Sequence, residues 1–96
     1  MTDVFKAIAD PSRRALLDRL SVRNGQSLRD LSAGLAMSRQ AVTKHLGVLE
    51  AAGLVISVRA GRERRHSLNP VPLLADLRPW LAKFERMPLG DLTGED

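Results

Sequence analysis

Four side chains with strong hydrogen-bonding groups fall within one short stretch of the chain: Arg39, Gln40, Thr43 and Lys44. A guanidinium and a primary amide can each make two parallel hydrogen bonds to a planar partner. A hydroxyl and an ammonium group suit single contacts to an oxyanion. Together, these side chains could bind a partner that is flat, forms hydrogen bonds and carries negative charge.

A second polar segment, RAGRERR from Arg59 to Arg65, carries four arginines around a single glycine. Between Ser38 and His66 there are six basic and two acidic residues, so the whole net charge of +4 lies in less than a third of the chain. Charges at a turn can serve only to discourage edge-to-edge sheet pairing, but mixed signs would do that equally well. Positive charge concentrated in this way is typical of proteins that bind a polyanion.

The length and composition fit one small folded domain. The chain has 96 residues, of which 44% are hydrophobic, and it contains no cysteine. Disulfides and thiolate metal sites are therefore excluded. We expect residues 1–88 to form a single domain and residues 89–96 an acidic, flexible tail. No apolar run approaches the roughly 18–20 residues that span a membrane, so we expect a cytoplasmic protein with no membrane partner.

Three helices are predicted before the polar stretch. Apolar residues from Val4 to Ala9 have helical spacing, and Pro11 suits the first turn of a second helix. Ser27 can cap a short third helix, with Asp30 at the capping-box position. Gly34 then indicates a tight turn.

The polar stretch lies on the fourth predicted helix, which Ser38 can cap. Val42, Leu46 and Leu49 form its apolar stripe, and the four polar side chains project from the other side. Gly53 supplies the left-handed position that ends the helix. The stripe predicts a core helix, while the exposed row either is merely solvated or touches a partner.

A hairpin and one more helix complete the chain. Leu54–Arg59 and Arg64–Leu68 have strand patterns around a turn at Gly61, and Leu73–Met87 has helical spacing. The fold class is therefore α+β, mainly helical, with one two-stranded antiparallel sheet. Two short helices joined by a tight turn form a helix-turn-helix, and the basic hairpin after them is its wing.

The second helix of such a motif enters the DNA major groove. Arg39 can read a guanine edge and Gln40 an adenine, whereas Thr43 and Lys44 can reach phosphates. We therefore predict a double-stranded DNA partner. The predicted DNA-binding residues are Ser38, Arg39, Gln40, Thr43, Lys44, His45, Arg59, Arg62, Arg64 and Arg65.

Three long stretches, FKAIADPSRRALLDRL, SRQAVTKHLGVLEAAGLV and RAGRERRHSL, resemble the ArsR family of winged helix-turn-helix transcriptional regulators. The resemblance runs from about Val4 to Leu68. It implies a homodimeric bacterial repressor that binds an inverted-repeat operator through the helix at 38–52 and the wing at 59–65. It also implies release of the DNA on a signal, and pairing through the first and last helices. His66 stands where many relatives carry tyrosine, which we interpret as a packing change in the wing.

Many members of that family sense metals, but the ligands of such sites are missing here. The position of their cysteine motif reads Leu28-Arg29-Asp30-Leu31, and the only histidines are His45 and His66. We therefore expect a regulator of the type that does not sense metals, with no metal and no cofactor. An unidentified small-molecule effector remains possible. No serine lies in a nucleophile motif, and cysteine and tyrosine are absent, so we expect no enzyme.

The last helix carries an apolar stripe that could pack in the core or pair two subunits. We favour pairing because a small domain cannot bury every apolar side chain alone. Pro79 should kink the helix or begin a new one. The predicted dimer interface consists of Val4, Phe5, Ile8, Leu73, Leu77, Trp80, Leu81 and Phe84.

The sequence is also compatible with two other functions. A winged helix can also act as a protein-interaction module, in which this wing would dock an acidic partner. The other alternative is a metal-responsive repressor, which metal analysis of the protein would test.

Overall fold

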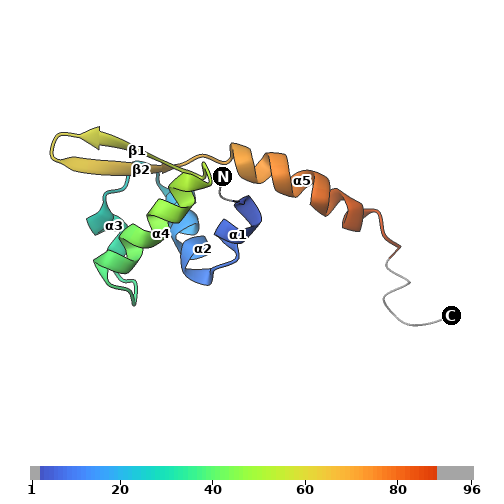
Figure 1. The fold of residues 1–96 in the computed structure, drawn as a ribbon, viewed down its shortest axis with the longest axis horizontal. Helices are drawn as coiled ribbons and strands as arrows, with labels where there is room; N and C mark the ends of the chain where they lie inside the picture. The colour runs from blue at the N-terminus through green and yellow to red at the C-terminus, as the bar shows by residue number, and fades with distance from the viewer. Residues whose placement is uncertain (1–2, 89–96) are drawn as a thin grey trace.

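The computed structural model describes residues 3–88, which form five helices and one hairpin (Figure 1). The predicted tail at 89–96 lies outside the described residues. The elements are α1 (Val4–Ile8), α2 (Pro11–Val22), α3 (Leu28–Ser32), α4 (Arg39–Ala51), β1 (Val55–Ala60), β2 (Glu63–Leu68) and α5 (Val71–Glu85). This is the predicted α+β, mainly helical winged helix-turn-helix. Among residues 3–88, no helix is long and apolar enough to cross a membrane.

Side-chain caps set the starts of the helices that lead to the polar stretch. Asp10 caps α2 directly before the proline at its first position. The predicted capping box of α3 is present: the Asp30 N–H donates to Ser27 Oγ at 3.2 Å, and the Ser27 N–H donates to Asp30 Oδ2 at 3.1 Å. Ser38 caps α4 by accepting from the Ala41 N–H at 3.1 Å. Short helices gain their fixed ends from such caps, because their first N–H groups have no partner within the helix.

The core lies between α2, α3, α4 and the start of the hairpin. The apolar stripe of α4 is buried as predicted, through Val42, Leu46 and Leu49. Leu31 of α3 and Leu54 before β1 are fully enclosed in the same cluster. The apolar stripe therefore fixes which face of α4 remains outside.

The wing is an antiparallel pair whose register follows from its short turn. Ala60 pairs with Glu63, which leaves Gly61 and Arg62 to form the loop. Gly61 has φ +65°, a left-handed conformation that favours glycine and suits two-residue hairpin loops. The next pair down the ladder is Arg59 with Arg64.

A bridge between Gln26 and His66 attaches the wing to the helices. His66 is 6% exposed, which agrees with the predicted packing role in the wing. Its N–H donates to the Gln26 carbonyl at 2.8 Å, and the Gln26 N–H donates back at 3.1 Å. The sheet is therefore tied to the segment directly before α3.

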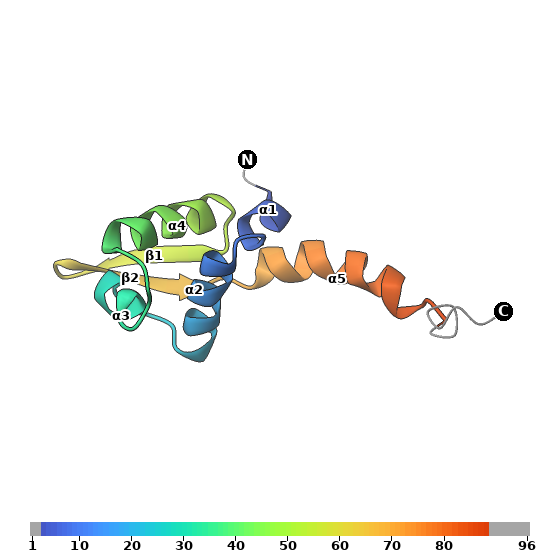
Figure 2. The same cartoon turned by 90° about the horizontal axis from the view of Figure 1, so that it is seen from below.

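Helix α5 differs from the other long helices because none of its fifteen residues is buried. It projects away from the winged body (Figure 2). It begins two residues earlier than predicted and runs unbroken through Pro79, so the expectation of a new helix start there is wrong. Proline removes the N–H partner of the Ala75 carbonyl, but both residues are exposed, so water can serve that carbonyl.

The capping box of α3 should make stability depend on pH. The Ser27 backbone N–H, followed by its hydroxyl, holds the pKa of Asp30 below its ordinary value of 3.8. A depressed carboxyl pKa stabilises the fold above the unfolded value and loses that contribution as pH falls through the folded value. We expect Asp30→Asn to lower the free energy of unfolding at neutral pH, with the two proteins converging as the pH falls through the folded pKa of Asp30. Urea denaturation across pH measures this, and a constant difference at all pH values would contradict it.

Candidate nucleic-acid interface

The face of α4 opposite the core presents the predicted polar row to solvent. Gln40, Thr43, Lys44 and Gly47 are all exposed, and so is Arg39 at the first position of the helix. Because the N-terminal end of a helix carries free N–H groups and positive potential, this end of α4 favours an anion. The predicted row and its anion-binding end are therefore together on one accessible surface.

The wing turns one of its two faces toward the same helix. Ser57 and His66 are register partners, and the Ser57 hydroxyl donates to Glu50 Oε1 of α4 at 2.6 Å. Two positions further along the strands, Arg59 and Arg64 lie on that same face, because side chains alternate along a strand. Two arginines of the wing are thus placed on the face that looks toward α4.

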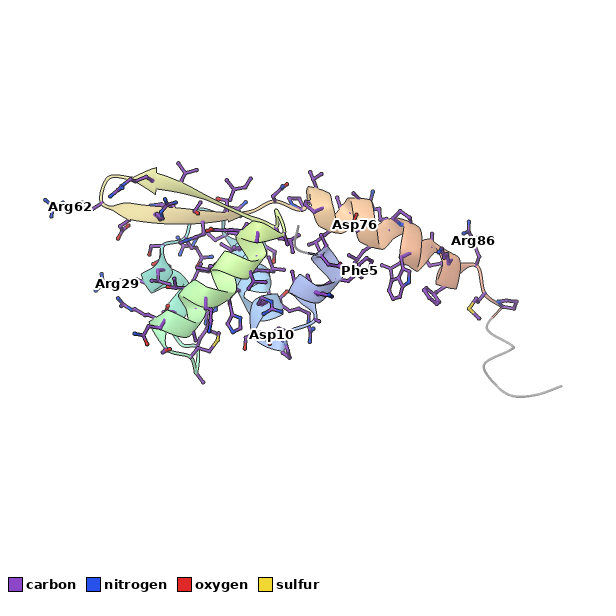
Figure 3. The ribbon with its side chains drawn as sticks, viewed as in Figure 1. Phe5, Asp10, Arg29, Arg62, Asp76 and Arg86 are labelled. Carbon is purple, nitrogen blue, oxygen red and sulfur yellow. The ribbon has the colours of Figure 1, made fainter. Side chains whose placement is uncertain are left out.

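The Arg59–Arg64 pair brings two like charges directly opposite each other. Such pairs destabilise a sheet, because opposed side chains lie about 5 Å apart at Cβ. Neither guanidinium makes an ion pair with any residue in 3–88, and the same is true of Arg39, Lys44 and Arg62. Arg62 lies at the wing tip and extends outward (Figure 3). Positive charge that the protein does not neutralise internally favours an external anion.

Two of the sequence-predicted residues are separated from this surface. Arg65 lies on the other face of the wing, where it donates to the Gly25 carbonyl at 3.2 Å and to Glu63 at 3.3 Å. His45 is half-buried, and its Nδ1 lies 3.4 Å from Asp10 Oδ2 and 3.5 Å from Arg13. Both side chains are occupied by partners within the chain. The structure therefore brings together eight of the ten predicted DNA-binding residues and leaves out these two.

The contacts of His45 were not apparent from the sequence. Arg13 donates to the Ala7 carbonyl at 2.6 Å and lies 3.5 Å from Asp10, so one cluster joins α1, α2 and α4. The only sequence signal was the position of His45 at the margin of the apolar stripe. We interpret the cluster as a support that fixes the orientation of α4.

Comparisons with known proteins agree with this geometry. A helix-turn-helix domain family matches residues 8–58. The chain is 44% identical to the HTH-type regulator YuzN of Bacillus subtilis, over 81% of this chain and 91% of that protein. It is 33% identical to the transcriptional repressor SdpR of the same organism, over 88% and 91%. An ArsR-like transcriptional regulator from Rhodococcus sp. RHA1 superposes with a TM-score of 0.71 at 40% identity, over 86% and 80%. This chain belongs to the ArsR family. It is a DNA-binding transcriptional regulator.

In this ArsR-family protein, α1 and α5 meet through aromatic side chains. Phe5 and Trp80 have ring centroids 5.7 Å apart, and Trp80 and Phe84 have centroids 5.0 Å apart, both edge-to-face. The three rings remain 38%, 46% and 52% exposed. With exposed Leu81, they form an apolar surface that no other segment of residues 3–88 covers.

The other predicted interface residues lie closer to the core. Val4 is only 6% exposed and packs in the central cluster, so its place in the predicted interface is wrong. Ile8, Leu73 and Leu77 are half-buried against the same cluster. The physical reason is that α1 is a single short turn, whose inner side faces α2 rather than a second subunit.

Potential metal ligands are scattered. Within residues 3–88, no group of three or more histidine, cysteine, aspartate or glutamate side chains could hold a metal ion. The two histidines lie in separate environments, one beside Asp10 and the other beside Gln26.

The like-charge pair of the wing should have a measurable cost. We expect Arg64→Gln to raise the free energy of unfolding by roughly 0.2–1 kcal/mol at low salt, since it removes repulsion across the ladder. The gain should disappear near 1 M salt, where screening acts within about 3 Å. Urea denaturation at several salt concentrations measures it. Arg62→Gln is the control, because Arg62 lies in the loop and faces no arginine in register. Equal behaviour of the two variants would contradict the assignment.

Proposed function

We propose that this protein is a homodimeric repressor that binds an inverted-repeat operator with α4 and the wing of each subunit. The observation that carries the proposal is the unneutralised Arg59–Arg64 pair, which faces the same side as the polar row of α4. A positive wing beside a polar helix face matches a groove-reading helix flanked by a backbone-binding hairpin. The resemblance to a named repressor supports the direction of regulation.

Each part of the surface has a distinct proposed role. Arg39 and Gln40 contact base edges, because their planar groups can bond guanine and adenine in a bidentate manner. Thr43 and Lys44 contact phosphates, as do the arginines of the wing. Gly47 lets the helix approach the sugar–phosphate backbone, since a side chain there would project from the exposed face.

The second subunit is proposed to dock on the apolar surface formed by Phe5, Trp80, Leu81 and Phe84. A two-fold interface uses the same surface on both copies, which suits a patch that continues along α5. Two reading helices related by such an axis should contact half-sites about one helical turn apart, or a multiple of that. We also infer that the regulator has no catalytic activity. It acts in the cytoplasm, where the promoter DNA lies.

The alternative of a protein-interaction module uses the same arginines on an acidic protein surface. It explains the charge of the wing but leaves the polar row of α4 without a role. DNA binding is favoured because both elements then serve one partner.

Selection of bound duplexes from a random library tests DNA reading. We expect an inverted repeat. Gln40→Ala should relax the preference at one base pair, by about 1–3 kcal/mol of discrimination. Arg62→Ala and Arg64→Ala should weaken binding to all duplexes alike and reduce the salt slope by roughly one unit each.

Arg86→Ala is a matched control, because Arg86 lies at the far end of α5 (Figure 3). Recovery of no duplex, or a complex insensitive to salt, would refute the proposed role in DNA binding. An equal effect of the Gln40 and Arg62 variants on specificity would refute the division between base and phosphate contacts.

The oligomeric state tests the α1–α5 surface. We expect Phe84→Glu to convert the dimer to a monomer, because a charge on the apolar surface cannot be buried without a partner. Sedimentation equilibrium measures the change, and circular dichroism checks that the helices persist. Val22→Glu is the control, since Val22 is exposed at the end of α2 and away from the patch. A wild-type monomer at micromolar concentration would contradict the proposed dimer.

A further inference from the structure

A cavity of about 540 Å³ lies between α3, α4 and the wing. This volume is within the usual range of small-molecule sites, about 300–1,000 Å³. The lining residues are Ser27, Leu28, Arg29, Thr43, Leu46, Gly47, Glu50, Ser57, Glu63, Arg64 and His66.

One wall of this groove is apolar and open. Leu28 and Leu46 contribute their side chains, and a Cβ atom added to Gly47 would meet no atom within 4 Å. Gly47 therefore keeps the groove clear in the middle of α4. Space beside aliphatic side chains suits the apolar body of a ligand.

At the wing side of the groove, His66 presents an unused hydrogen-bond acceptor. Its Nδ1 lies 3.0 Å from the Gln26 carbonyl oxygen, which can only accept, so Nδ1 carries the hydrogen. In the neutral ring, Nε2 is then an acceptor, and it has no partner among residues 3–88. Within that range, the one fully enclosed side-chain polar atom without a partner is Ser32 Oγ. Nε2 of the otherwise buried His66 is therefore accessible, and His66 lines the groove.

The groove has an excess of unpaired positive charge, because Glu50 is its only lining carboxylate without an ion pair in residues 3–88, against two unpaired arginines. Glu50 accepts from the Ser57 hydroxyl at 2.6 Å, and Glu63 pairs with Arg65 at 3.3 Å. Arg29 and Arg64 have no ion pair or side-chain hydrogen bond within the described part of the chain. Arg29 lies at the same end of the molecule as the wing tip (Figure 3). Two free guanidinium groups suit one carboxylate, which can accept bidentate hydrogen bonds.

We propose that this groove binds a small amphipathic carboxylate that carries a hydroxyl or N–H group at its other end. Arg29 and Arg64 bind the carboxylate, the Leu28–Leu46 wall contacts the apolar body, and His66 Nε2 accepts from the distal donor.

The position of the groove also implies a mode of regulation, which rests on the proposed DNA-binding function. Thr43, Gly47 and Arg64 belong both to the groove and to the proposed DNA surface. A bound carboxylate would occupy the guanidinium of Arg64 and fill the space beside Gly47. The ligand therefore competes directly with the operator, without a change transmitted through α5.

Binding can be tested on the protein without DNA. The probes are 4-hydroxybenzoate and 6-hydroxy-2-naphthoate, added to ¹⁵N-labelled protein and followed by NMR. We expect at least one probe to shift the amide signals of Gly47, Ser57 and His66, with a Kd of about 1 mM or tighter. 6-Hydroxy-2-naphthamide, which lacks the charge, and 2-naphthoate, which lacks the donor, should bind more weakly. No shift in the groove with either probe, or equal binding of the amide, would overturn the proposal.

Variants assign the contacts. Arg29→Ala should weaken binding about tenfold, whereas Arg86→Ala should leave it unchanged. His66→Asn keeps an N–H toward Gln26 and removes Nε2, so it should abolish the preference for the hydroxylated probe. Gly47→Leu should fill the groove and prevent binding, with Ala51→Leu on the exposed part of the same helix as the control. Unchanged binding by Arg29→Ala and Gly47→Leu would overturn the site.

Competition is measured separately, with the selected duplex. The probe that binds should raise the apparent Kd for DNA in proportion to its concentration, and a ternary complex would refute direct competition. If no duplex is recovered, the proposed function fails while the NMR result still decides whether the groove binds a carboxylate.

Discussion

The position of the wing depends on a buried polar connection between Gln26 and His66. The backbones of the two residues bond each other, and the imidazole Nδ1 reaches the same carbonyl. The Gln26 side chain donates to the carbonyls of Arg19 and Arg23 at the end of α2, at 2.9 and 2.6 Å. A buried polar group that loses its partner costs about 1–3 kcal/mol. Displacing the wing would break several such bonds together, so the hairpin and the helices behave as one unit.

Because this connection holds the wing rigidly, the charges of the wing can be arranged for binding an anion rather than for stabilising the sheet. Arg59 and Arg64 remain opposed because the register of a two-residue loop leaves them no other place. A freely moving hairpin could move away from α4, and its positive charges would then lie far from the polar row. Held against the body, the wing keeps its positive face beside the polar row, where an anion can contact both.

Local chemistry made most of the fold predictable from the sequence. Ser27 and Ser38 cap helices that begin where predicted, because capping depends on residues only three positions apart. The apolar stripe of α4 likewise follows from helical period. The opposition of Arg59 and Arg64 could also have been derived by counting outward from Gly61.

Contacts between distant segments were less accessible to sequence reasoning. Val4 was predicted at the dimer interface and His45 among the DNA-binding residues, because nothing local shows that α1 packs inward or that Asp10 lies beside α4. The groove beside Gly47 results from the distance between the wing and α4, which is set by the bridge between Gln26 and His66, two residues 40 positions apart in the chain. No pattern of neighbouring residues in the sequence indicates such a distance between elements. The new helix start expected at Pro79 is absent, because exposure relieves the usual penalty of an interior proline.

The lack of buried residues in α5 also bears on how proteins of this kind diversify. Among residues 3–88, every fully enclosed large side chain belongs to α2, α3, α4 or the start of the hairpin. Substitutions along the exposed side of α5 therefore leave the core intact. If α5 pairs subunits as proposed, new pairing specificities can arise there independently of the proposed DNA surface. Duplicated copies of such a gene could then stop exchanging subunits before their operators diverge.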